Sequence, residues 1–306
     1  MHSPVVRKIF LLICLFMLVT LACDLSFTVA PSTNPAPGST DAVLPVTLAP
    51  TQIPASLTSL PETLVPNTAP AGVEVSFGTL SLVLPAGLAS GVRGSQIPRA
   101  DGKDLPYWSL TPGHTQIQLE GYPVQGKSHE PQIYVYPAQA YAEMVPAAFE
   151  SIHRLDNILY VPGGPMLNDE LPAVPFLNAY QAFASNVQSL SFQNGGGVRF
   201  LTEYAQYAVS ANNQELFYHF QGVSRDGAYY IVAILPITVP LVAETSDGGA
   251  ALPTGGVPYP YFADPNADMQ SYYKSVVDVL NATPAEMYTP TISQLDALIQ
   301  SMRTTP

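Results

Sequence analysis

The residue with the most specific chemistry in this sequence is Cys23, which ends the stretch LVTLAC. Arg7 and Lys8 precede an uncharged, largely apolar run of fourteen residues, 9–22. A basic start followed by a short apolar core is typical of an export signal. The run is too short to span a bilayer, which takes about 20 apolar residues. We therefore expect residues 1–22 to be removed at export, which would leave Cys23 beside the point of cleavage.

Ala22 followed by Cys23 resembles the lipobox of bacterial lipoproteins, in which a small residue precedes a cysteine that is lipidated and becomes the new N-terminus. Thr20 and Leu21 depart from the residues that this family prefers at their positions. The resemblance implies a lipid anchor on Cys23 and a cell-membrane location facing the extracytoplasmic side. Cleavage by an ordinary signal peptidase is the alternative. Cys14 lies in the discarded segment, so Cys23 would have no disulfide partner.

Motifs for nucleophilic or phosphate chemistry are weak in this sequence. Ser271 and Lys274 fit the S-x-x-K pattern of penicillin-recognising enzymes, but the partner motifs S-D-N and K-T-G are absent. The glycines at 195–197 lead into an expected strand, whereas a phosphate loop leads into a helix. We read them as a hairpin turn. The sequence therefore assigns no catalytic residue and predicts no cofactor.

Metal-binding patterns are also incomplete. Asp264, Asn266 and Asp268 alternate as in the first half of a calcium loop, but Met269 stands where the turn glycine is required. We favour helix capping for these residues and keep calcium as the alternative. The histidines expected to remain after processing are scattered without zinc spacing, and structural roles are favoured for all of them: His114, His129, His153 and His219.

Two long stretches, 85–113 and 244–264, show neither helical nor strand periodicity and contain several aromatic residues. Loops of this length tend to be either functional or disordered. The candidate binding residues on them are Tyr107, Trp108, Tyr259, Tyr261 and Phe262. Such aromatics suit a glycan or a protein hot spot, but the favoured interpretation is that they fold over the sheet edges as a satellite of the core.

Charge limits the possible partners of the domain. Residues 73–306 hold nine Lys plus Arg and twenty Asp plus Glu, a net charge of −11. Nucleic acid and anionic lipid surfaces would repel this charge, so we expect neither as a partner.

The helices and strands that would position the candidate binding residues are expected in residues 73–306, after a tether at 23–72. Residues 24–72 hold nine Pro, eight Thr and no Lys or Arg, and such a composition predicts a disordered spacer or, alternatively, a proline-motif ligand. Beyond it, aromatic and branched runs at 186–193, 197–207, 214–222 and 228–236 predict a four-strand antiparallel meander. Upstream runs at 73–85, 115–122 and 132–137 are expected to extend this sheet, while 138–160, 267–282 and 289–303 read as helical. The expected fold is one α+β domain, a mainly antiparallel sheet with helices packed on it.

The stretches FQNGGGVRFLTEYAQY, NNQELFYHFQG and DGAYYIVAILP resemble a family of uncharacterised bacterial lipoproteins. The C-terminal half, with its closing LDALIQSMR helix, is loosely similar to the Mog1/PsbP-like fold. Neither resemblance implies an activity. The favoured hypothesis is a noncatalytic, membrane-anchored module that binds an envelope protein or glycan. The alternatives are a cell-surface hydrolase with paired carboxylates and an assembly factor for a membrane complex.

Overall fold

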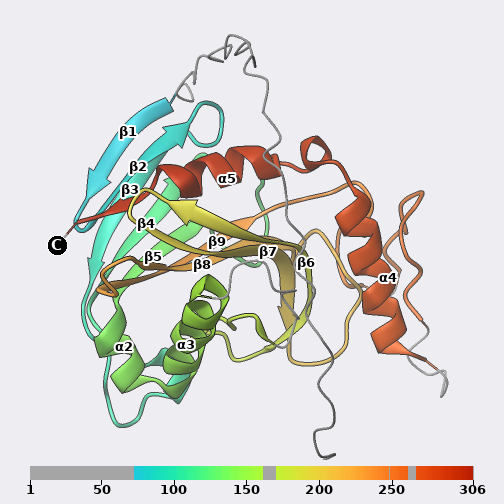
Figure 1. The fold of residues 1–306 in the computed structure, drawn as a ribbon. Coiled ribbons are helices and arrows are strands. Elements are labelled where there is room, and N and C mark those ends of the chain that lie inside the picture. The colour runs from blue at the N-terminus through green and yellow to red at the C-terminus, as the bar shows by residue number, and fades with distance from the viewer. Residues whose placement is uncertain (1–71, 161–169, 248, 261–266, 306) are drawn as a thin grey trace, which may run out of the picture. The chain divides into compact units, whose positions relative to one another are not determined.

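A seven-stranded antiparallel sheet lies at the centre of the computed structural model, which describes residues 72–160, 170–247, 249–260 and 267–305 (Figure 1). All of these residues belong to one compact unit. Helices pack on the sheet, so the α+β prediction is confirmed. The predicted signal peptide, Cys23 and nearly all of the tether lie outside the described residues and stay predictions.

The predicted meander is confirmed. Its strands β6 (Tyr180–Phe192), β7 (Gly195–Ala205), β8 (Phe217–Ser224) and β9 (Tyr229–Pro236) are consecutive antiparallel neighbours. The β6–β7 hairpin turns at residues 193 and 194, and the glycines 195–197 lie in β7 itself, so the interpretation of these glycines as the turn was wrong. A Cβ atom on Gly197 would overlap the Gln221 carbonyl oxygen of β8, so the close approach of these strands explains the glycine.

The remaining strands correct two expectations. β4 (His114–Glu120) and β5 (Gln132–Pro137) extend the sheet through β9, as predicted. The 73–85 run instead folds as β1 (Gly72–Phe77) and β2 (Leu80–Pro85), which form a separate three-stranded sheet with β10 (Arg303–Thr304). The stretch 85–113, expected to be irregular, contains the edge strand β3 (Gly91–Ile97). β3 escaped prediction because its half-exposed, glycine-containing sequence shows little alternation.

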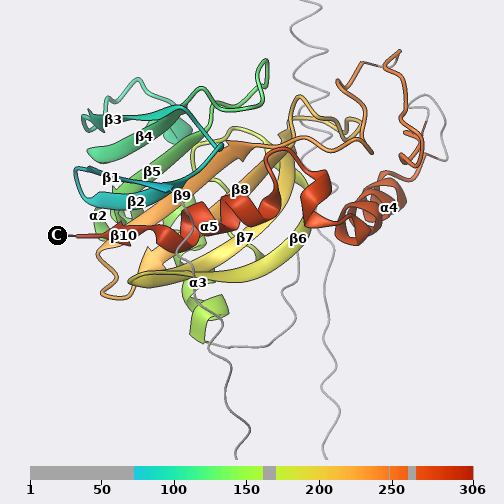
Figure 2. The same ribbon diagram turned by 90° about the horizontal axis from the view of Figure 1, so that it is seen from above.

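Helices cover both faces of the main sheet (Figures 1 and 2). α2 (Ala138–Met144) and α3 (Pro146–Tyr160) pack on one face, and α3 begins at its proline, where a missing N–H is tolerated. α4 (Met269–Ala282) contacts β6, while α5 (Ile292–Ser301) contacts β2 and β6 on the opposite face. Short 3-10 turns, η1 (Tyr107–Ser109) and η3 (Ala285–Met287), complete the elements. The described helices do not include one with the length and hydropathy that a membrane span requires.

Candidate functional site

The first wall of the candidate site is α4. Asp268 begins this helix as its N-cap, because its carboxylate accepts the Ser271 backbone N–H at 3.0 Å. Tyr272, Val276 and Leu280 follow at intervals of four and are buried, so a single face of α4 points inward.

The second wall is the segment 239–260, which is irregular but anchored at its start. The Asn213 side chain accepts the Val239 backbone N–H at 2.9 Å and donates to the Val239 carbonyl at 3.1 Å. It also donates to the Glu244 carboxylate at 3.0 Å. One buried amide therefore satisfies both backbone groups of Val239, at the start of a segment whose described residues form no strand or helix.

Three tyrosines join the two walls to residues 208–211. The Tyr272 hydroxyl accepts the Ala211 N–H at 2.9 Å, and the Tyr259 hydroxyl donates to the Ala208 carbonyl at 3.1 Å. Tyr273 bonds both backbone groups of Val209, at 3.1 and 2.8 Å. The rings of Tyr259 and Tyr272 meet edge to face with their centroids 5.2 Å apart. These contacts fix the spacing between α4 and the irregular segment.

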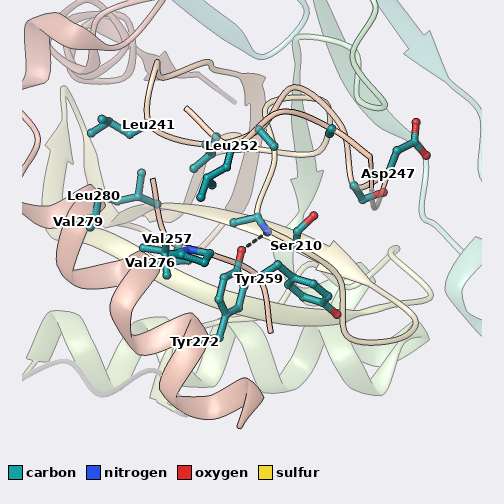
Figure 3. A pocket seen from close by; sticks show the side chains of 16 residues that line it. Ser210, Leu241, Asp247, Leu252, Val257, Tyr259, Tyr272, Val276, Val279 and Leu280 are labelled. Carbon is teal, nitrogen blue, oxygen red and sulfur yellow. Dashed lines mark hydrogen bonds between the residues drawn. The ribbon is translucent and has the colours of Figure 1, made fainter. Parts of the chain in front are cut away.

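A cavity of about 510 Å³ lies between these walls (Figure 3). This volume falls in the range of small-molecule sites. Most of its lining is aliphatic or aromatic, as the full set shows: Ser210, Ala211, Leu241, Val242, Ala243, Ser246, Asp247, Ala250, Leu252, Val257, Pro258, Tyr259, Tyr272, Val276, Val279 and Leu280.

Few polar groups line the cavity, and three of them are hydroxyl groups that can still donate a hydrogen bond. The Tyr272 hydroxyl accepts one bond, and its hydrogen has no acceptor among the described residues. The Ser210 and Ser246 hydroxyls likewise make no hydrogen bond to any of the described residues. Among the described residues of the lining, Asp247, at an exposed position, is the one that carries a charge, and none is a cation. The cavity therefore suits a neutral molecule with an apolar body and a hydrogen-bonding oxygen.

A buried carboxyl group lies close to the tyrosines. Glu203 of β7 has no exposed surface, and its Oε1 accepts the Asn212 N–H at 2.6 Å. Its Oε2 has no hydrogen-bond partner among the described residues. Burial raises the pKa of Glu203 well above its usual value, and the neighbouring Glu215 adds to the effect. Glu203 does not line the cavity, so a bound molecule would not touch it.

The predicted aromatic candidates separate in the structure. Tyr259 lines the cavity, whereas Tyr107 and Trp108 form η1 elsewhere, with ring centroids 4.9 Å apart. Tyr261 and Phe262 lie outside the described residues.

The calcium pattern is only partly described, since Asp264 and Asn266 fall outside the described residues. Asp268 caps α4, which agrees with the capping interpretation. Among the described residues, no group of three His, Cys, Asp or Glu side chains is placed to hold a metal.

His219 is a structural histidine, as predicted. Its Nδ1 lies 3.1 Å from the Ala233 carbonyl, and its Nε2 lies 2.7 Å from the Gln221 amide nitrogen. A neutral ring that donates from Nδ1 and accepts at Nε2 satisfies both contacts. Burial lowers the pKa of His219 to about 3.

The S-x-x-K pattern makes no catalytic pair. Lys274 is bonded to Asp278 at 2.6 Å, and the Ser271 hydroxyl donates to Asp268 at 2.5 Å. Lys274 therefore forms a surface ion pair, and Ser271 is part of the N-cap of α4.

Sequence reasoning missed Ser210, Tyr272 and Asn213. The period of α4 marks Tyr272 as inward-facing, but it does not distinguish a core residue from a cavity lining. Asn213 carries no local signal, because its partners Val239 and Glu244 lie far away in the sequence. Ser210 carries none because it lies between the strands and belongs to no periodic element.

No protein-family model, curated protein or solved structure matches this chain. The resemblances to a lipoprotein family and to the Mog1/PsbP-like fold therefore stay predictions.

Proposed function

We propose that this chain is a membrane-anchored extracytoplasmic lipoprotein whose domain binds a small neutral amphipathic molecule without chemical turnover. The observation that carries the binding function is the apolar cavity of about 510 Å³ beside α4, with its unused hydroxyl hydrogens. The basic start, the short apolar run and Cys23 support the anchor.

The lining determines the class of ligand. Aliphatic side chains from α4 and from residues 241–257 favour an apolar body. The Tyr272 and Ser210 hydroxyls offer hydrogens to an oxygen such as that of an alcohol, ether or ester. A carboxylate would enter without a cation to pair with it and close to Asp247, so its desolvation would be uncompensated. We therefore expect a long-chain alcohol to bind more tightly than the fatty acid of the same length.

A binding role is preferred to hydrolysis because of the position of Glu203. This residue has the raised pKa that a general acid needs, but it has no exposed surface and is separate from the cavity lining. A hydrolase acting through paired carboxylates needs both groups beside its substrate.

Displacement of a neutral apolar dye, N-phenyl-1-naphthylamine, from residues 24–306 tests the ligand class. We expect 1-decanol to displace the dye at least tenfold more effectively than decanoate. Equal displacement by both, or dye binding that neither compound reverses, would contradict the proposed ligand class.

A pair of matched variants locates the binding. Val257→Trp puts a large ring into the cavity, whereas Thr254→Trp puts the same ring at an exposed position three residues earlier. Dye and decanol affinity should fall at least tenfold in the first variant and less than twofold in the second. Thermal unfolding of both variants checks that the fold is intact.

The anchor has a separate test. Cells given an alkyne-bearing fatty acid should label the full-length chain, and Cys23→Ser should abolish the label and release the protein from the membrane fraction. A labelled Cys23→Ser protein would overturn the anchor while leaving the cavity proposal intact.

A further inference from the structure

A second hollow lies at the end of the meander, where β6 begins and β7 ends. It has a volume of about 360 Å³ and is lined by Tyr107, Leu177, Asn178, Ala179, Tyr180 and Gln206. Tyr180 is the first residue of β6, and it pairs in register with Ala205, the last residue of β7. Gln206 follows directly and donates to the Asn178 carbonyl at 3.1 Å, which holds one side of the hollow in place.

The two tyrosines of this hollow are left in solvent. Tyr180 is 82% exposed and Tyr107 is 60% exposed. An aromatic ring stabilises the fold when it is buried, and these two rings are not. Their apolar faces beside one hollow are therefore available to a partner. The other described residues of the lining are amide or aliphatic, and none of them is charged.

We infer that this hollow binds a neutral hexopyranose chain. One face of a pyranose ring presents C–H groups that carry partial positive charge, and the face of a tyrosine ring is negative. The hydroxyls at the edge of the sugar both donate and accept hydrogen bonds, as do the side-chain amides of Asn178 and Gln206. A neutral chain also escapes the repulsion that the net acidic domain exerts on anions.

This site is independent of the α4 cavity, since the two sets of lining residues do not overlap. A protein with both sites would hold a small amphipathic molecule in its cavity while the tyrosine hollow contacts a glycan. Failure of one binding test would therefore leave the other unaffected.

The chain carries its own reporter for this site. Trp108 is the single tryptophan of the sequence, and its ring meets that of Tyr107 edge to face at 4.9 Å. A sugar stacked on Tyr107 changes the surroundings of Trp108, so tryptophan fluorescence of residues 24–306 should change saturably during titration. The probes are four neutral tetrasaccharides: cellotetraose, chitotetraose, maltotetraose and mannotetraose.

We expect at least one of these probes to bind, and Tyr180→Ala to weaken its binding at least tenfold. Tyr207→Ala is the matched control, because Tyr207 is 76% exposed and does not line the hollow. It should change the affinity less than twofold. Tyr107→Ala should weaken binding as Tyr180→Ala does. Its binding is measured by calorimetry, because this substitution alters the surroundings of the fluorescent Trp108.

Two results would overturn the inference. One is a flat titration with all four tetrasaccharides by both fluorescence and calorimetry. The other is an equal loss of affinity in Tyr180→Ala and Tyr207→Ala, which would show that binding does not depend on the hollow.

Discussion

Arg199 of β7 is paired with Asp296 of α5, with 3.1 Å between Nε and Oδ1 and side chains that are 8% and 19% exposed. The same Oδ1 accepts the Tyr218 hydroxyl at 2.7 Å. Arg199 also donates to the Gln188 side chain at 2.6 Å and to the Asn186 carbonyl. Arg199 borders an open hollow of about 500 Å³, but its donors are occupied within the fold. This network therefore joins α5 to the meander and leaves little of the guanidinium for an anion.

Asp296→Asn should destabilise the domain by about 3 kcal/mol, because it leaves the Arg199 charge nearly buried without its counterion. Urea unfolding of residues 24–306, followed by circular dichroism, measures this change. Asp278→Asn is the control, since it removes an exposed i,i+4 pair with Lys274 and should cost less than about 0.5 kcal/mol. Similar effects of the two substitutions would mean that the Arg199 pair adds no more than a surface pair.

The parts of the fold that depend on local patterns were predicted from the sequence. Runs of aromatic and branched residues between turn formers identified the meander, and the period of Ile292, Leu295 and Ile299 identified α5, whose inward face is buried. β3 was missed because its sequence shows little alternation and its place depends on contacts with residues elsewhere in the chain. A Cβ atom on Gly94 would overlap the ring of Phe77, so this glycine leaves room for a side chain of the other sheet.

The candidate site was predicted only in part. Tyr259 was identified because it is an aromatic residue on a long irregular stretch. The cavity beside it depends on the hydrogen bond between Tyr272 and Ala211, which lie 61 residues apart, and on the Asn213 amide, which orders segment 239–244. Contacts of this kind leave no periodic trace in the sequence.

Gly197→Ala should destabilise the domain by about 1–3 kcal/mol, because the added methyl group overlaps the Gln221 carbonyl of the neighbouring strand. Gly249→Ala adds the same group where no atom lies within 4 Å and should change the stability by less than about 0.5 kcal/mol. Urea unfolding of the two variants compares them directly. A neutral Gly197→Ala would show that strand packing does not require glycine at position 197.

Glu203→Gln should stabilise the domain relative to wild type as the pH rises. Burial raises the pKa of Glu203 in the folded state above its usual value of 4.5, so the folded protein favours the protonated acid. The stability that this protonation contributes is complete below pH 4.5 and is lost as the pH rises toward the folded-state pKa, at up to about 1.4 kcal/mol per pH unit. Glutamine does not titrate and loses nothing. Unfolding measured at pH 4, 6 and 8 should show the difference growing in favour of the variant, and a difference independent of pH would place the carboxyl in a better solvated site.

His219→Gln tests how the free energy of unfolding changes at acidic pH. Burial lowers the pKa of His219 from 6.5 to about 3, so the folded protein keeps the ring neutral while the unfolded chain protonates it below pH 6.5. The wild-type free energy of unfolding should therefore fall between pH 6.5 and 3, with His219 contributing up to about 1.4 kcal/mol per pH unit. Glutamine removes this contribution and can still donate to the Ala233 carbonyl, so the variant should gain relative to wild type as the pH is lowered from 7 to 4. His114, whose pKa burial also lowers, is present in both proteins and cancels in the comparison. His129 is present in both proteins too, and its charge adds to the lowering of the His219 pKa, in the same direction as burial. A constant difference across this range would mean that the folded protein accepts a charge at His219 and that the Ala233 and Gln221 contacts do not hold the ring neutral.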